Sequence, residues 1–210
     1  MSERIIQKNK IQPQEEDFDL IKAFLENADN RTAFNRLVLK YKDMVFNLCF
    51  RLLGDYDEAN DCAQEIFIKV FNNLKSFKFE SSFTTWLYRI SVNTCKNNLS
   101  SLTSRMKKKM MSLDNPGNDL ESSNISNYKI DVRDNLNNPA ELYDKKEREI
   151  IIQNAVDSLK GKEKMLVILR DIEGKSYEEI AAITELNMGT VKSKLARARQ
   201  ELRDKLRGVI

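Results

Sequence analysis

The chain is organised around the stretch Asn72-Asn-Leu-Lys-Ser-Phe-Lys-Phe-Glu-Ser-Ser-Phe-Thr-Thr-Trp-Leu-Tyr-Arg-Ile-Ser-Val-Asn-Thr-Cys-Lys-Asn-Asn98. From Phe83 onward its apolar residues recur at helical spacing, which predicts a buried helical stripe containing Trp86. Phe77 and Phe79 precede this pattern in a short loop, where packing does not readily explain two aromatic rings. Because aromatic rings stack on unpaired bases and the interleaved cations neutralise phosphates, the stretch also predicts a surface that holds single-stranded nucleic acid.

The composition is typical of a helical protein without catalytic machinery. The 210 residues include 32% charged residues and carry a net charge of +3, so only local patches can be strongly basic. Histidine, the commonest general base and metal ligand, is absent. The spacing of Cys49, Cys62 and Cys95 fits neither a paired-cysteine metal site nor a redox pair. Cys62 and Cys95 lie within helical patterns and are interpreted as small buried side chains. Without an apolar run of membrane-spanning length or an apolar signal core, we expect a cytoplasmic protein with no membrane insertion, cofactor or metal.

Apolar spacing predicts an all-α fold of two small helical domains joined by a flexible linker. The expected division is a flexible arm at residues 1–16, a first domain at 17–99, a linker at 100–138 and a second domain at 139–210. Asp17 or Asp19 is a candidate cap for the first helix, and Gly54 is expected to end the second. The linker is rich in Asn, Ser and Asp without sustained apolar periodicity, so it cannot bury enough surface to offset its ordering entropy.

The C-terminal stretch predicts a helix-turn-helix. Ser176 and Glu179 form a capping-box pattern before a short helix, and a basic helix begins near residue 189. One side of that helix is apolar, and the opposite side is polar and basic, with a shape and chemistry suited to a major groove. This outer side carries Lys192, Ser193, Ala196, Arg197 and Gln200. The alternative is an ordinary amphipathic helix whose charged side is only solvated.

Two parts of the chain resemble the sigma-70 family of bacterial sigma factors, in particular its extracytoplasmic-function group. Asp61-Cys-Ala-Gln-Glu-Ile-Phe-Ile-Lys-Val-Phe, Ser76-Phe-Lys and Thr85-Trp-Leu-Tyr-Arg-Ile-Ser-Val-Asn-Thr-Cys-Lys-Asn are similar to the promoter-melting domain of that family. Tyr177-Glu-Glu-Ile-Ala and Gly189-Thr-Val-Lys-Ser-Lys-Leu-Ala-Arg-Ala-Arg are similar to its C-terminal domain, which reads the upstream promoter element.

The resemblance implies a transcription initiation factor rather than an enzyme. It would bind RNA polymerase core through the clamp helices and the flap, read the -35 element with the helix-turn-helix, and open the -10 element by capturing a base. The implied core-binding residues are Asp61, Gln64, Glu65 and Phe67. The implied -10 contacts are Phe77, Lys78, Phe79, Glu80, Ser81, Arg89, Ile90, Asn93, Lys96 and Asn97. The implied -35 contacts are Thr190, Lys192, Ser193, Lys194, Ala196 and Arg197.

Further partners and mutational effects follow from the same resemblance. Promoter DNA would be bound both as duplex and as single strand, and the resemblance implies an anti-sigma factor as a further partner. Phe77→Ala is expected to lose promoter opening but keep core binding, whereas Glu65→Lys is expected to weaken core binding. On composition alone, a solvated acidic helix face is the favoured interpretation of Asp61 and Glu65, and only the resemblance favours a docking surface.

Three positions depart from the family pattern. Many relatives have Gly where this chain has Glu185, and a side chain there disfavours a left-handed turn. Many have Pro in place of Asn187, which can instead cap the following helix. Lys194 replaces a more frequent Arg, which favours phosphate positioning over bidentate reading of a base.

Two other classes of function compete with a sigma factor. A stand-alone helix-turn-helix regulator would bind duplex DNA without polymerase core, and it would leave the Phe77–Ser82 loop and the Asp61–Glu65 segment unexplained. A DNA-processing enzyme would need a nucleophile or clustered carboxylates for a metal, and no such cluster is evident along the sequence.

Overall fold

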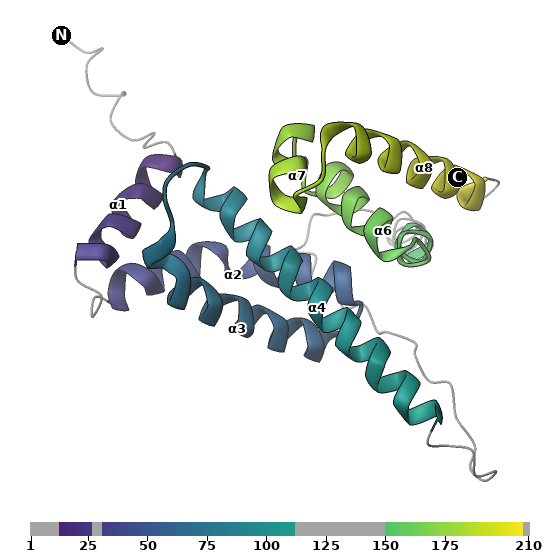
Figure 1. Cartoon of the computed structure of the whole chain (residues 1–210), viewed down its shortest axis with the longest axis horizontal. Coiled ribbons are helices and arrows are strands. Elements are labelled where there is room, and N and C mark those ends of the chain that lie inside the picture. The colour runs from purple at the N-terminus through teal and green to yellow at the C-terminus, as the bar shows by residue number, and fades with distance from the viewer. Residues whose placement is uncertain (1–12, 27–30, 112–149, 208–210) are drawn as a thin grey trace, which may run out of the picture.

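All of the secondary structure in the described residues is helical. It is a computed structural model, and it describes residues 13–26, 31–111 and 150–207 (Figure 1). The first half contains α1 (Pro13–Glu26), α2 (Arg31–Leu53), α3 (Tyr56–Asn73), the 3-10 turn η1 (Leu74–Ser76) and α4 (Phe83–Met111). The second half contains a helical segment at residues 150–157, α6 (Gly161–Val167), the π-helical turn η2 (Ile168–Ile172), α7 (Tyr177–Thr184) and α8 (Met188–Leu206). The predicted all-α class with two helical regions is confirmed.

The first domain packs α1 to α4 around an apolar core. Its most deeply buried side chains include Ile21, Phe24, Leu37, Leu48, Ile66, Leu74 and Leu87, each at most 1% exposed. Gly54 ends α2 as predicted, because its φ of +81° is a left-handed conformation that glycine adopts without a steric penalty. Asp55 then caps α3 by accepting a hydrogen bond from the backbone N–H of Glu58 at 2.9 Å. This tight connection brings α3 directly against α2.

Helix ends differ from the expected ones at both sides of the first domain. Helix α1 begins at Pro13, so residues 13–16 of the expected arm are helical, and proline is well suited to a first helical turn. Asp17 therefore lies inside α1 and is not a cap; its buried carboxylate accepts hydrogen bonds from Lys40 and Tyr41. Helix α4 continues to Met111, because residues 100–111 lack Gly and Pro and extend an already nucleated helix.

Most of the expected linker, residues 112–138, lies outside the described residues, as do residues 1–12 and 139–149. The second domain begins in the structure with the helical segment at 150–157. Its core is built by Leu166, Ile168, Leu169, Ile180, Ile183, Val191, Leu195 and Ala198, each at most 1% exposed. Helices α7 and α8 form the predicted helix-turn-helix over α6.

The two domains contact one another through what we call the interdomain clasp, formed by Arg51, Leu52, Tyr88, Lys164, Glu173 and Lys175. The Glu173 carboxylate accepts hydrogen bonds from Arg51 Nη1 at 2.6 Å and Tyr88 Oη at 2.7 Å. Lys175 Nζ lies 4.2 Å from the centre of the Tyr88 ring, and Lys164 Nζ donates to the Leu52 carbonyl at 2.9 Å. Helix α7 packs along α4 beside these contacts (Figure 1). Burial, followed by the Glu173 hydrogen bond, raises the pKa of the Tyr88 hydroxyl well above its usual value.

Candidate functional site

Phe77 is part of the core rather than a free loop side chain. It is only 7% exposed, and its ring centre lies 5.2 Å from that of Trp86 and 6.0 Å from that of Phe83. The prediction that nothing packs behind this ring is therefore wrong. The helix that starts at Phe83 brings two large rings under the loop, and short sequence spacing does not reveal that contact. The predicted burial of Phe83, Trp86 and Leu87 is confirmed.

Phe79 is the aromatic ring that the loop exposes. Its side chain is 42% exposed, and the ring rests on Phe77 at 4.8 Å and on Phe18 of α1 at 5.1 Å between ring centres. Its φ of +58° is left-handed, which costs a residue with a side chain about 1–2 kcal/mol. Strained backbone of this kind persists where the surrounding structure holds it, and it concentrates at functional sites. Sequence reasoning missed Phe18, which is 47% exposed. Its spacing places it beside the apolar side formed by Ile21 and Phe24, and a large apolar residue at such a position was the available signal.

The first half of α4 presents a polar and basic side next to this loop. Ser82 caps the helix by accepting from the backbone N–H of Thr85 at 3.1 Å, which fixes the loop to the helix start. Of the predicted -10 contacts, Phe77 is buried and Ile90 half-buried, whereas the others are exposed: Lys78, Phe79, Glu80, Ser81, Arg89, Asn93, Lys96 and Asn97. Positions 89, 93, 96 and 97 share one helical side, so cations and amides line a single surface.

Helix α8 carries the outer side that its sequence predicts. Val191, Leu195 and Ala198 are buried against the domain, and Lys192, Ser193, Ala196, Arg197 and Gln200 are exposed. Asn187 caps the helix by accepting from the backbone N–H of Thr190 at 2.7 Å, as predicted. Ser176 and Glu179 form the predicted capping box on α7, with hydrogen bonds of 3.0 and 2.8 Å.

Lys194 is placed differently from its neighbours on α8. Its ammonium group is ion-paired with Glu163 of α6 at 3.2 Å, and the side chain is only 26% exposed. Thr190 is half-buried at the start of the same helix. The expected -35 set therefore divides into an exposed group, Lys192, Ser193, Ala196 and Arg197, the half-buried Thr190, and Lys194, whose ion pair joins α8 to α6.

Glu185 adopts the left-handed turn that its side chain disfavours. It ends α7 with φ +57° and ψ +25°. The turn between the two helices is thus formed as a glycine would form it, at a steric cost to this chain.

Replacing Glu185 with glycine is expected to stabilise the second domain. Glycine removes the steric strain of the left-handed conformation, which stabilises the folded chain, but it also gives the unfolded chain more conformational freedom. Because the first effect is larger, the free energy of unfolding should rise by about 0.5–1 kcal/mol. Urea unfolding followed by circular dichroism measures the change. Ala182→Gly, an exposed position inside α7, is the matched control and should lower the same quantity by about 1 kcal/mol. Equal destabilisation by both variants would contradict the strain at Glu185.

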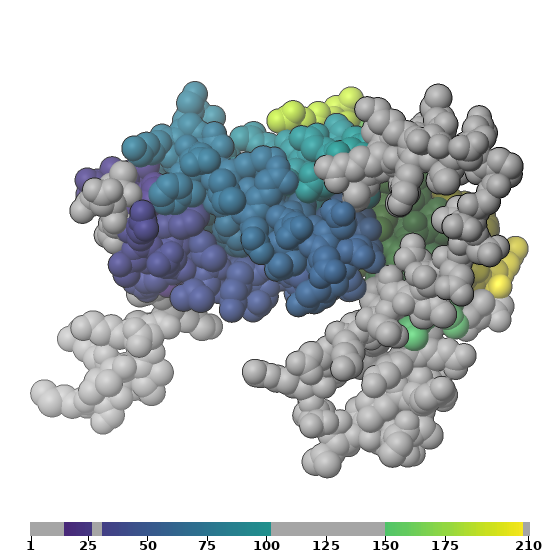
Figure 2. Space-filling model, turned by 90° about the horizontal axis from the view of Figure 1, so that it is seen from below, coloured from purple at the N-terminus to yellow at the C-terminus, as the bar shows by residue number. Residues whose placement is uncertain are grey.

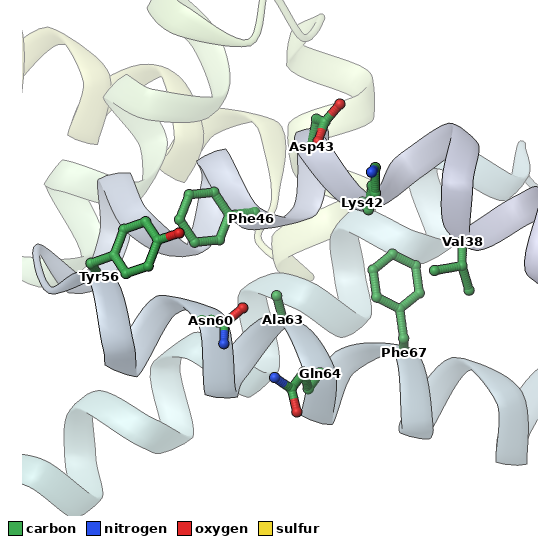
Figure 3. Close-up of a pocket in the computed structure, with 9 residues that line it drawn as sticks. All are labelled: Val38, Lys42, Asp43, Phe46, Tyr56, Asn60, Ala63, Gln64 and Phe67. Atoms are coloured by element: carbon green, nitrogen blue, oxygen red, sulfur yellow. The ribbon is translucent and has the colours of Figure 1, made fainter. Parts of the chain in front are cut away.

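A groove between α2 and α3 is lined by two of the four predicted core-binding residues, Gln64 and Phe67. It has a volume of about 350 Å³ and is lined by Val38, Lys42, Asp43, Phe46, Tyr56, Asn60, Ala63, Gln64 and Phe67 (Figure 3). Gln64 and Phe67 line it, while Asp61 is exposed and Glu65 half-buried on the same helix. The second domain does not cover the blue surface of α2 and α3 in the view of Figure 2. The α2 side of the groove was missed from the sequence, although Phe46 lies outside the buried stripe of its helix and was a signal for it.

Large apolar side chains on the two helices that form the groove are exposed. Tyr56 is 65% exposed, and Leu39 of α2 and Ile68 of α3 are exposed to a similar extent. Glu65 accepts from Lys69 Nζ at 2.7 Å and from Asn98 Nδ2 at 3.3 Å, and the hydrogen bond from Lys69 holds the pKa of its carboxyl below the usual value. A hollow lined partly by aromatic side chains, with exposed apolar residues and the Glu65 carboxylate on the same helices, has the chemistry of a protein-docking surface.

Both halves of the chain match known protein families. Residues 37–105 match the family described as Sigma-70 region 2, and residues 149–202 match Sigma-70, region 4. The chain is 36% identical over 182 residues to the ECF RNA polymerase sigma-E factor of Escherichia coli (strain K12), covering 86% of this chain and 90% of that protein. It is 34% identical over 190 residues to the RNA polymerase sigma-H factor of Pseudomonas aeruginosa, covering 90% and 93%.

A solved structure shares the fold. The sigma factor RpoE, in complex with the anti-sigma factor NepR from Bartonella quintana, aligns with a TM-score of 0.57 at 24% identity, over 83% of this chain and 97% of that one. Among the described residues, no helix is both long and apolar enough to cross a membrane.

Proposed function

This chain belongs to the extracytoplasmic-function group of the sigma-70 family, non-enzymatic factors that direct RNA polymerase to promoters, and on that premise we propose a residue-level mechanism for it. The first domain docks on polymerase core and captures a base of the -10 element. The second domain reads the -35 element. The single observation that carries the proposal is Phe79, an exposed ring held in a strained conformation beside the cationic side of α4.

Base capture uses Phe79 as a stacking surface. Flipping a base from the duplex costs a few kcal/mol, and stacking on an aromatic ring returns about 1–3 kcal/mol. Phe77 and Phe18 support the ring from behind, so little conformational freedom is lost on binding. The Asn93 amide offers a donor and an acceptor to a base edge, and Arg89 and Lys96 neutralise neighbouring phosphates.

Reading of the -35 element uses the exposed outer side of α8. Arg197 can donate two hydrogen bonds to a guanine, and Ser193 and Lys192 can contact a base or a phosphate. Lys194 acts chiefly by holding α8 to Glu163, which keeps the helix at a fixed angle to α6. Ala196 leaves the helix surface flat enough to approach the bases.

Docking on polymerase core uses the groove between α2 and α3. An apolar helix side of the clamp would fill the hollow lined by Phe46 and Phe67. The carboxylates of Asp61 and Glu65, which lie on α3 but do not line the groove, would pair with basic side chains on the partner. The flap remains the proposed contact of the second domain.

The interdomain clasp must open before both promoter elements are read. The -10 and -35 elements are numbered by position, and these numbers differ by about 25 base pairs. At 3.4 Å per base pair, this separation is roughly 85 Å of duplex. Two domains in direct contact through Glu173 and Tyr88 cannot span that distance. We propose that polymerase core separates them, and that an anti-sigma factor acts by preventing this separation.

Reversing the charge of Glu173 is expected to open the chain. Glu173→Lys removes the carboxylate that accepts hydrogen bonds from Arg51 and Tyr88, and it adds a cation to a clasp that already contains Arg51 and Lys175. The radius of gyration measured by small-angle X-ray scattering should therefore increase. Glu178→Lys makes the same charge change at an exposed position of α7 and should leave it unchanged. An unchanged radius in Glu173→Lys would show that the clasp does not hold the domains together.

The experiment that tests the proposed function is binding to purified bacterial RNA polymerase core, followed by transcription from a library of promoter templates. Core binding with selective new transcripts supports it and yields the promoter sequence. Arg197→Ala should keep core binding and weaken recognition only upstream, with a loss of about 1–3 kcal/mol at the affected base pair. DNA binding without core binding would instead establish a stand-alone regulator.

A further inference from the structure

The fold gathers the cysteines of the chain at one point of the first domain. The sequence contains three, Cys49, Cys62 and Cys95, and they lie on α2, α3 and α4 respectively. Cys95 Sγ lies 3.6 Å from both Cys62 Sγ and Cys49 Sγ, and all three sulfur atoms lie within 4.8 Å of one another. The three are free thiols, each at most 1% exposed.

These separations are close to those of sulfur atoms bound to one ion. With a metal–sulfur bond of about 2.3 Å, three sulfurs arranged around a single ion lie about 4 Å apart. Two of the three pairs are already closer than this, so small side-chain rotations suffice to form the site. The three helices themselves need little movement.

The surroundings select the charge of the ion. Among the described residues, the group of possible ligands contains the three thiols and no histidine or carboxylate, so a fourth ligand for a tetrahedral zinc ion is missing. Three thiolates around a monovalent or divalent ion also leave a net negative charge in an apolar core, which costs several kcal/mol. A trivalent ion makes the site neutral, and arsenic(III), which carries a lone pair, takes three ligands.

We propose that Cys49, Cys62 and Cys95 form a binding site for a trivalent thiophilic ion of the arsenite class. Arsenous acid, As(OH)3, would exchange its three As–O bonds for three As–S bonds. Each thiol proton leaves with one hydroxyl group, so three water molecules are released and no atom is oxidised or reduced. The ion reaches the core through local opening of the helices.

A bound ion at this site would also affect the docking surface. Cys62 follows Asp61 directly on α3, and Glu65 lies one turn further along. An ion at this point ties α3 to α2 and α4, which are the helices that form the groove and the -10 surface. The proposal stands independently of the proposed function, because binding is measured without polymerase or DNA.

The test is incubation of the reduced full-length chain with sodium arsenite, followed by native mass spectrometry. The expected product gains one arsenic atom and loses three hydrogens, a mass change that distinguishes three-thiol ligation from surface adsorption. Because the ion binds the folded chain, the Tm should rise; binding restricted to the unfolded chain would lower it. The ordinary interpretation, three thiols packed as small apolar side chains, predicts no retained arsenic and an unchanged Tm.

Variants make the outcome specific to the cluster. Cys95→Ala and Cys49→Ala should each lose the three-hydrogen signature and the rise in Tm, with folding of each checked by circular dichroism. Ser91→Ala, a buried small residue on the same helix as Cys95, should behave as the unaltered chain. Persistence of the three-hydrogen signature in Cys95→Ala, or preferential retention of zinc in a competition with arsenite, would overturn the proposal.

Discussion

Phe79→Ala is expected to reduce promoter opening by roughly 5- to 150-fold, which corresponds to the loss of about 1–3 kcal/mol of base stacking. Affinity for polymerase core should not change, because Phe79 lies in the loop before α4 and not in the groove between α2 and α3. Opening is measured by permanganate reactivity of unpaired thymines on a promoter template. Phe79→Tyr keeps an aromatic ring and should retain most of the activity.

The neighbouring ring provides the contrast. Phe77→Ala removes a buried ring that packs on Trp86, so it should lower the free energy of unfolding by about 3–5 kcal/mol. The effect first expected of Phe77, loss of opening alone, is therefore expected of Phe79 instead. Normal opening by Phe79→Ala, with Phe77→Ala folded and defective, would return the role to Phe77.

Filling the docking groove is expected to have the second large effect. Gln64→Trp places an indole in the hollow between α2 and α3 and should weaken core binding by at least about 10-fold, the scale of a blocked interface hot spot. Asn72→Trp adds the same side chain to an exposed position of α3 that does not line the groove, and it is the matched control. Fluorescence anisotropy of labelled protein against core polymerase measures both.

Gln64 is a cleaner position for this test than Glu65. Glu65→Lys should also weaken core binding, but it breaks the contacts to Lys69 and Asn98 and sets two lysines side by side. Loss of affinity in Glu65→Lys could therefore arise from rearrangement of α3. Unchanged affinity in Gln64→Trp, with the fold intact, would move the docking surface away from the groove.

Regular helices were predictable because their side chains repeat every 3.6 residues. The buried and exposed sides of α8, its Asn187 cap and the capping box at Ser176 all follow from local spacing, since a helix determines which neighbours share a side. Lys194 shows the limit of this reasoning. Its ion pair with Glu163 joins residues 31 positions apart, and helical spacing contains no information about the partner.

The sequence by itself determined the helical class, the helix-turn-helix and the resemblance to sigma factors, because each rests on residues close together along the chain. Only the tertiary structure decided that Phe77 is buried and Phe79 exposed, that Glu173 closes the clasp, and that three distant cysteines meet. Each of these depends on which helices pack together. Packing maximises burial over the whole domain and thereby sets contacts that no local pattern encodes.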